Sequence, residues 1–261
     1  MPIGVIRMVR TFCLVAILVS GCNSALTPRG RQLLVGGAEA LEAEKYDETI
    51  TQMDEFVRDN PRSEHLARAY YLRGKAYYGL KNIALASDDL AEAARTGSGL
   101  VKMNAQLALG DIAWDAGDLA MAERLYVAVS DEVSAGDVPG DHAHYRLGCV
   151  RQRLGKWQEA DVQFHGVVEH FPGSELARRA ARRVNATAWT IQTGAFGTKA
   201  RGDSHAKQMR AKNVPIELVP VLMGGRPMFL AVSGRYTKYK QALATLDRVK
   251  RVQSDAFVTV R

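Results

Sequence analysis

The side chains best suited to catalysis lie near the middle of the chain, where His142, His144 and Cys149 are close in sequence. A cysteine beside a base can act as a nucleophile, and two histidines beside Asp141 can hold a metal ion in a loop. An unpaired cysteine is, however, more often a small buried hydrophobic residue. The two histidines are two residues apart, which does not place them on one helix face. We expect neither a nucleophile nor a metal site at these residues.

No other pattern typical of an enzyme occurs in the sequence. There is no phosphate-binding glycine loop, no metal-ligand spacing and no pair of carboxylates in an apolar setting. The sequence therefore predicts a binding protein, with no catalytic residue, metal or cofactor.

The segment from Trp189 to Phe196 offers side chains suited to binding. It reads WTIQTGAF and is rich in residues that favour β-strands. Alternation along a strand places Ile191 on one face and Thr190 and Gln192 on the other. If Ile191 packs in the core, Gln192 lies on the exposed face. A glutamine amide both donates and accepts hydrogen bonds, which suits sugar hydroxyl and N-acetyl groups.

The spacing of aromatic, aliphatic, Gln, Gly and Phe residues in this segment resembles the first strand of a SPOR domain. A second part of the SPOR signature is similar to the segment from Phe229 to Tyr236, FLAVSGRY. The resemblance runs from about Ala186 to the C-terminus. It implies a small bacterial module that binds peptidoglycan glycan strands stripped of their stem peptides. It also implies an RNP-like α/β fold, a four-stranded antiparallel sheet with two helices on one face and the other face open.

The elements expected after Ala186 follow the order of that fold. Gly224 and Gly225 predict a two-residue β-hairpin turn. Asn213 follows the first helix, at a position where a residue with a left-handed backbone conformation often ends a helix. The first helix is expected to be capped by Asp203 or Ser204. The expected strands and helices, in chain order, are Trp189 to Thr193 (strand), Asp203 to Lys212 (helix), Ile216 to Leu222 and Met228 to Ser233 (strands), Lys238 to Val249 (helix) and Ala256 to Val260 (strand).

The resemblance assigns the binding residues. Gln192, Thr190 and Trp189 are expected to contact sugar. Arg226 is a candidate for pairing with the lactyl carboxylate that N-acetylmuramic acid exposes once an amidase removes the stem peptide. Trp189 or Phe229 would stack on a pyranose ring, or both would be rim or core aromatics.

One strand departs from the family pattern. The register predicts Leu230 and Val232 on the open face, where many SPOR domains carry basic or polar residues, and Ala231 and Ser233 toward the core. Either this strand is slipped, or the binding face is more apolar than usual.

The N-terminus reads as a lipoprotein signal peptide. Arg7 and Arg10 precede a short apolar run, which is too short to span a membrane. Ser20 and Gly21 before Cys22 resemble a lipobox, which implies acylation of Cys22. The protein would then be anchored in the envelope on the periplasmic side, and the outer membrane is the expected location. The expected divisions are 1–21 signal peptide, 22–35 lipid anchor and linker, 36–185 helical repeats and 186–261 SPOR domain.

Charge separates the repeats from the C-terminal module. From Ala186 onward the chain carries thirteen Lys or Arg and four Asp or Glu. A basic module often binds nucleic acid, but nucleic acid is not a partner expected for an exported protein. Glycan strands are therefore the expected partner.

The region between anchor and module repeats with a period close to that of the tetratricopeptide repeat (TPR). Four glycines recur at intervals of 37, 36 and 38 residues, and a large apolar residue follows each by sixteen. The pairs are Gly37 and Met53, Gly74 and Leu90, Gly110 and Tyr126, and Gly148 and Phe164. This pattern is similar to TPR repeats and predicts an α-helical solenoid of close-packed helix pairs that holds an unknown protein partner. Ser174 is expected to cap a closing helix that reaches Val184.

These features are compatible with two alternative functions. In the first, the SPOR-like module binds denuded glycan, richest at the division septum, while the repeats hold a partner. In the second, the protein is an envelope-assembly scaffold that works through its TPR surface, and the SPOR-like segment is degenerate.

Overall fold

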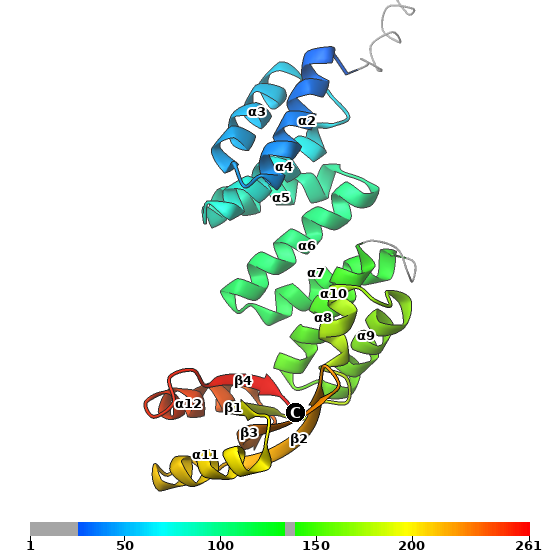
Figure 1. Cartoon of the computed structure of the whole chain (residues 1–261). Coiled ribbons are helices and arrows are strands. Elements are labelled where there is room, and N and C mark those ends of the chain that lie inside the picture. Colours follow the sequence, from blue (N-terminus) through cyan, green and yellow to red (C-terminus); the bar gives the residue numbers. More distant parts are fainter. Residues whose placement is uncertain (1–25, 134–138) are drawn as a thin grey trace, which may run out of the picture. The chain divides into compact units, whose positions relative to one another are not determined.

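The computed structural model describes residues 26–133 and 139–261 (Figure 1). The signal peptide and Cys22, the expected lipid attachment, lie outside the described residues. The chain divides into two compact units, Met1–Leu109 and Gly110–Arg261. None of the helices in the described part of the chain is long and apolar enough to cross a membrane.

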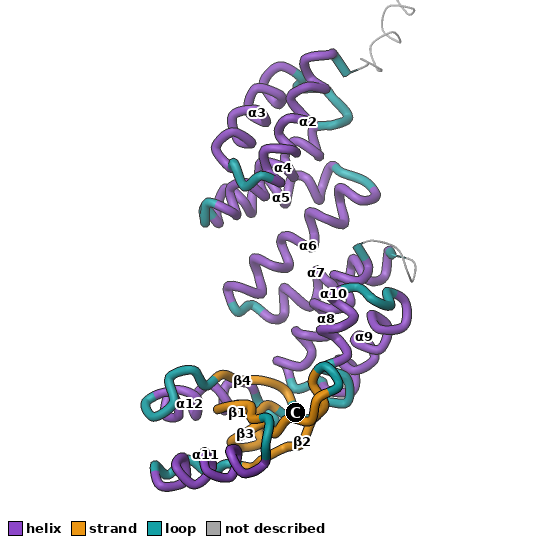
Figure 2. Tube along the Cα trace, viewed as in Figure 1, coloured by secondary structure: helices purple, strands orange, loops and turns teal. Residues whose placement is uncertain are grey.

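Both units contain antiparallel helix pairs (Figure 2). The helices are α2 (Pro28–Glu42), α3 (Tyr46–Asp59), α4 (Leu66–Gly79), α5 (Ile83–Thr96), α6 (Gly99–Ala116), α7 (Leu119–Glu132), α8 (Gly140–Leu154), α9 (Trp157–His170) and α10 (Glu175–Ala181). Because α2 begins at Pro28, residues 28–35 are helical rather than the linker expected from the sequence. The prediction of a helical repeat array is confirmed.

Each repeat glycine allows a close approach between two helices of a pair. A methyl group on Gly148 would lie 2.7 Å from Cε1 of Phe164, and one on Gly110 would lie 2.6 Å from Cε1 of Tyr126. Gly74 faces Leu90 in the same way. The residue sixteen positions later therefore packs against the bare backbone of each glycine, as the spacing predicted.

The closing helix is α10, and Ser174 caps it as expected. The Ser174 hydroxyl accepts the N–H of Ala177 at 3.0 Å. The helix ends at Ala181, three residues earlier than predicted, because the N–H of Arg183 bonds the carbonyl of Ala180 and tightens the turn. Asn185 then adopts a left-handed φ of 61° and leads the chain into the sheet.

The C-terminal module is an antiparallel sheet with two helices packed on it. The strands are β1 (Trp189–Phe196), β2 (Glu217–Met223), β3 (Arg226–Tyr236) and β4 (Phe257–Val260), in the order β2-β3-β1-β4. The helices are α11 (Lys199–Ala211) and α12 (Tyr239–Lys250). The predicted fold class is confirmed.

One core fixes both helices to the same face of this sheet. Ile191 of β1 and Ala231 of β3 are fully buried, and they pack with Met209 of α11 and Leu246 of α12. Because residues alternate between faces, the side chains next to Ile191 and Ala231 in sequence point to the opposite, helix-free face.

Local details of the module follow the sequence with one correction. Gly224 and Gly225 have φ values of 56° and 73°, which is the two-residue turn expected between β2 and β3. Asn213 has a φ of 60°, as predicted. The cap of α11 is Thr198, whose hydroxyl accepts the N–H of Arg201, rather than Asp203 or Ser204. The helix therefore begins a full turn before the expected cap.

Candidate functional site

The helix-free face of the sheet is hollowed into a groove of about 500 Å³. Its walls are aliphatic, since the side chains of Val219, Val221, Leu230 and Val232 line it. The prediction that Leu230 and Val232 lie on the open face is confirmed. β3 pairs with β2 without interruption from Arg226 to Val232, and the register shifts of its pairing with β1 leave Leu230 and Val232 on the open face. The apolar character of the face is a property of this chain.

Gln192 lies in this groove, as the alternation predicted. It is half-buried, it lies opposite Val232 of β3, and its side chain forms no hydrogen bond within the described part of the chain. A glutamine amide that is held on a sheet with unused donors and acceptors can bind a polar ligand.

Thr190 borders the same groove but has no free hydroxyl. Its side chain is 1% exposed, and its hydroxyl donates to the carbonyl of Ser233 or Gly234, at 3.2 and 2.8 Å. The pairing of β1 with β3 is irregular at this point, which leaves those carbonyls for a side chain. Thr190 therefore stabilises the local bulge.

Trp189 does not lie on the groove. Its ring packs on Tyr239 of α12 and on Trp157 of α9, with centroids 4.7 and 5.5 Å away, and it is 4% exposed. Of the two roles considered for this residue, the structure supports the core aromatic. Arg153 of α8 completes the cluster with its guanidinium 4.8 Å from the Tyr239 ring, so these side chains link the module to α8 and α9.

Phe229 and Arg226 take opposite faces of β3. Phe229 lies opposite Phe196 of β1 and alternates with Leu230, which places it on the helix side. Arg226 shares the open face with Leu230, at the end of the strand nearest the hairpin. It is exposed and makes no ion pair with a described residue. Arg226 is therefore available to an anion.

The aromatic residue that the open face does carry is Phe257. It lies on β4 directly opposite Gln192 and is 50% exposed. The sequence placed residues 256–260 in a strand but contained no signal for their register, so this neighbour of Gln192 could not be identified.

The groove also includes a residue from outside the module. Arg182, which follows α10, lines it beside Thr259 and Val260 of β4. Arg261, which follows β4, also lines the groove, and its guanidinium donates hydrogen bonds to the carboxylate of Glu217 on β2, the opposite edge strand, which lower the pKa of that carboxyl. The charges of Glu217 and Arg261 thus neutralise each other, whereas Arg182 forms no ion pair with a described residue.

The residues with catalytic or metal-binding types are held in structural roles. Cys149 is 5% exposed, and burial raises the pKa of its thiol, so it is not an activated nucleophile. The ring of His144 lies 2.8 Å from the side-chain oxygen of Gln163. Across residues 26–133 and 139–261 no group of three His, Cys, Asp or Glu side chains forms a metal site.

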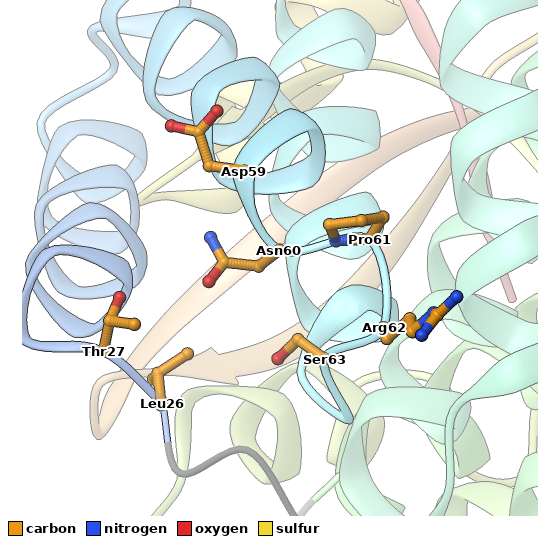
Figure 3. Close-up of a pocket in the computed structure, with 7 residues that line it drawn as sticks. All are labelled: Leu26, Thr27, Asp59, Asn60, Pro61, Arg62 and Ser63. Atoms are coloured by element: carbon orange, nitrogen blue, oxygen red, sulfur yellow. The ribbon is translucent and has the colours of Figure 1, made fainter. Parts of the chain in front are cut away.

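A separate hollow lies in the first unit, between the start of α2 and the loop after α3 (Figure 3). Thr27 borders it, and its hydroxyl accepts the N–H of Gly30 as the cap of α2. Asn60, also on its border, donates to the carbonyl of Phe56. Arg62 points away from the hollow. These polar groups are used by the fold, so the hollow offers little for a ligand.

Comparisons with known proteins agree with this architecture. The SPOR domain family matches residues 185–259, and a tetratricopeptide repeat family matches residues 142–174. No curated protein matches the chain.

Similar solved structures have low sequence identity to this chain. A MamA RS-1 double mutant has a TM-score of 0.49 at 14% identity, over 61% of this chain and 85% of the other. MamA from AMB-1 has a TM-score of 0.46 at 11% identity, over 86% and 99% of the two chains. A structure of nearly identical TPR-like repeats from Podosopora anserina has a TM-score of 0.46 at 14% identity, over 88% and 98%. The two family matches show that the chain joins tetratricopeptide-type helical repeats to a C-terminal SPOR domain, the peptidoglycan-binding family.

Proposed function

We propose that this chain is a lipid-anchored envelope protein that binds denuded glycan strands through the open face of its SPOR domain. The repeats hold a protein partner, and the SPOR domain brings that partner to wall from which amidases have removed the stem peptides, richest at the division septum. Cys22 carries the lipid, and the outer membrane is the proposed address.

The observation that carries the proposal is the position of Gln192. Within the segment that matches SPOR domains, it presents an unused amide in a groove on the helix-free face. Phe257 lies beside it as an exposed ring, and Arg226 stands at the hairpin end of the same face. Amide, ring and guanidinium are groups that suit an N-acetylated, carboxylate-bearing sugar chain.

Four polar residues on the repeat helices are candidates for contact with the protein partner. Arg68 on α4 is exposed. Arg146 on α8 is instead paired with Asp111 at 3.0 Å. Lys75 and Asn104 are half-buried. A partner that binds the first helix of each pair, such as α4, α6 or α8, would find Arg68 most accessible of these four.

Co-sedimentation of the full chain with sacculi tests the wall-binding function. The chain is purified in mild detergent and mixed with intact sacculi or with sacculi denuded by an amidase. We expect enrichment on the denuded sacculi and a loss of that enrichment in Gln192→Ala. Gln241→Ala is the matched control, since Gln241 is an exposed glutamine on α12 and lies away from the groove. Equal sedimentation with both kinds of sacculi would contradict the proposal.

A second function is favoured by the aliphatic walls of the groove. Val219, Val221, Leu230 and Val232 are unusual on a face that binds sugar, and they suit an envelope-assembly scaffold in which the SPOR domain no longer binds wall. Localisation separates the two functions. A septal band that disappears when residues 186–261 are deleted favours wall binding, whereas an even peripheral signal favours the scaffold.

A further inference from the structure

The edge of the groove formed by β4 is continuous with the last helix of the repeats. A second hollow shares Arg182, Thr259 and Val260 with the groove and extends onto Tyr145 of α8. Arg179 and Arg183 form its wall. The open face of the sheet therefore does not end at β4, and three guanidinium groups stand along its extension.

Two of these arginines are held in place by neutral groups. The guanidinium of Arg183 donates to the side-chain oxygen of Gln152 at 2.8 Å, and the Gln152 amide donates back to the carbonyl of Arg183 at 3.3 Å. Arg179 lies over the ring of Tyr145, 5.5 Å from its centroid. Neither interaction neutralises the positive charge.

Arg182 makes no hydrogen bond or ion pair with any residue from 26–133 or 139–261. The acid in α10 is Glu175, whose pKa is lowered first by its hydrogen bond with Arg178, at 2.6 Å, and less by the charges of Arg179 and Arg182. The hollow is thus lined by cations without a paired carboxylate, and this arrangement complements an anionic ligand.

The other free guanidinium of the face is at the far end. Arg226 lies six residues along β3 from Val232, which pairs with Gln192, so at 3.3 Å per residue Arg226 is on the order of 20 Å from the level of Gln192. Arg182 lies farther along the face, beside Thr259, which pairs with Thr190. Between them run the amide of Gln192 and the aliphatic walls.

We infer that the end of α10 is part of the glycan-binding site, with Arg182 pairing with a lactyl carboxylate at one end of the groove while Arg226 takes a second carboxylate at the other. The site is then composite, since Arg182 precedes the segment that matches SPOR domains. The ligand is one glycan strand that carries a carboxylate on every second sugar. This inference rests on the proposed wall-binding function and adds the repeats to the site.

Substitution within α10 and its last turn tests the inference in the full chain. Arg182→Gln removes the charge, and Arg182→Lys retains it. Arg178→Gln is the matched control, because Arg178 is an exposed arginine near by that is paired with Glu175 and does not line the groove. We expect Arg182→Gln to weaken binding to denuded sacculi by about 3- to 5-fold and to reduce its salt dependence, as loss of one exposed charge pair does. Arg182→Lys should recover most of the affinity, and Arg178→Gln should bind like the wild type.

Chemical neutralisation of the ligand provides the second arm. Denuded sacculi whose carboxylates have been converted to amides should bind the wild type more weakly, and the difference between wild type and Arg182→Gln should disappear on them. Equal binding of wild type and Arg182→Gln to untreated denuded sacculi overturns the inference alone. If wild type still binds the amidated sacculi more tightly than Arg182→Gln, the inference is also overturned, since Arg182 would then not pair with the carboxylate. A wild-type chain that fails to distinguish denuded from intact sacculi overturns the proposed function and the inference with it.

Discussion

Gln192 and Phe257 lie directly opposite each other on the neighbouring strands β1 and β4. Opposite residues of an antiparallel pair point to the same face, with Cβ atoms about 5 Å apart. The ring of Phe257 is 50% exposed, and the amide of Gln192 is unused by the described residues. This pair places an aromatic surface beside a donor and an acceptor on the face that carries the groove.

Phe257→Ala should weaken binding of the full chain to denuded sacculi by about 5-fold, since removing the ring forfeits roughly 1 kcal/mol of apolar burial against a sugar. The free energy of unfolding should change little, because half of the ring is already exposed. Leu243→Ala is a suitable control, as Leu243 is a partly exposed apolar residue on α12. If Phe257→Ala binds as tightly as Leu243→Ala, the ring takes no part in binding.

Gly148→Ala should destabilise the second unit by about 1 to 3 kcal/mol, the usual cost of overpacking a core. The added methyl group would meet the buried ring of Phe164 at 2.7 Å, and that ring has no exposed side toward which to move. Gly166→Ala is the matched control within the same repeat. It lies inside α9 with no atom within 4 Å of the new methyl group, so alanine should stabilise by about 0.5 to 1 kcal/mol. Urea unfolding of both variants measures the difference, and destabilisation of equal size in the two would contradict the packing argument.

The repeat packing was predictable because it is local in sequence. Gly148 and Phe164 are sixteen residues apart on two adjacent helices, so a single spacing in the sequence describes one contact in space. The faces of the sheet were predictable for the same reason. Alternation fixes which side Gln192 and Leu230 occupy once Ile191 is known to be buried.

The composition of the site was less predictable because it depends on distant contacts. The register of β4 against β1 places Phe257 beside Gln192, and no local pattern encodes that register. Trp189 packs on Trp157 of a repeat helix and therefore does not lie on the binding face. Arg182 enters the groove only because the chain turns after α10. The first depends on strand pairing within the sheet, and the other two depend on how the last repeat lies against it.

Trp157 and Trp189 should show an energetic coupling of about 0.5 to 1.5 kcal/mol in a double-mutant cycle, the range for aromatic pairs in contact. Their ring centroids are 5.5 Å apart and tilted by 57°. Trp189→Ala alone should cost about 3 to 5 kcal/mol, because this side chain is 4% exposed and also packs on Tyr239. Trp157→Ala should cost less, since Trp157 is only half-buried.

Urea unfolding of the two single variants and the double variant measures this coupling. Strict additivity of the two substitutions would mean that the SPOR domain and the last repeat do not stabilise each other through these rings.

His205 should make the SPOR domain less stable as the pH falls below about 7. Burial lowers the pKa of this imidazole below its usual value of 6.5, Lys212 lowers it further, and Asp255 opposes them. The neutral ring is accommodated on α11, where Nε2 lies 3.1 Å from the Thr193 hydroxyl and the ring contacts Phe196. In the unfolded chain the histidine binds a proton more readily than in the folded chain. The stability it contributes is therefore complete above the unfolded pKa and is lost as the pH falls from that value through the lower folded pKa.

The free energy of unfolding of the wild type should consequently fall between pH 7.5 and 5.5, above the range in which most carboxylates titrate. His205→Gln removes the titrating group and keeps a polar side chain near Thr193, so its stability should fall less over this interval. His170→Gln, which replaces an exposed histidine on α9, should retain the wild-type slope. An unchanged slope in His205→Gln would mean that the imidazole is protonated as easily in the folded chain as in the unfolded chain, and the burial of its ring against Phe196 would not disfavour the charged form.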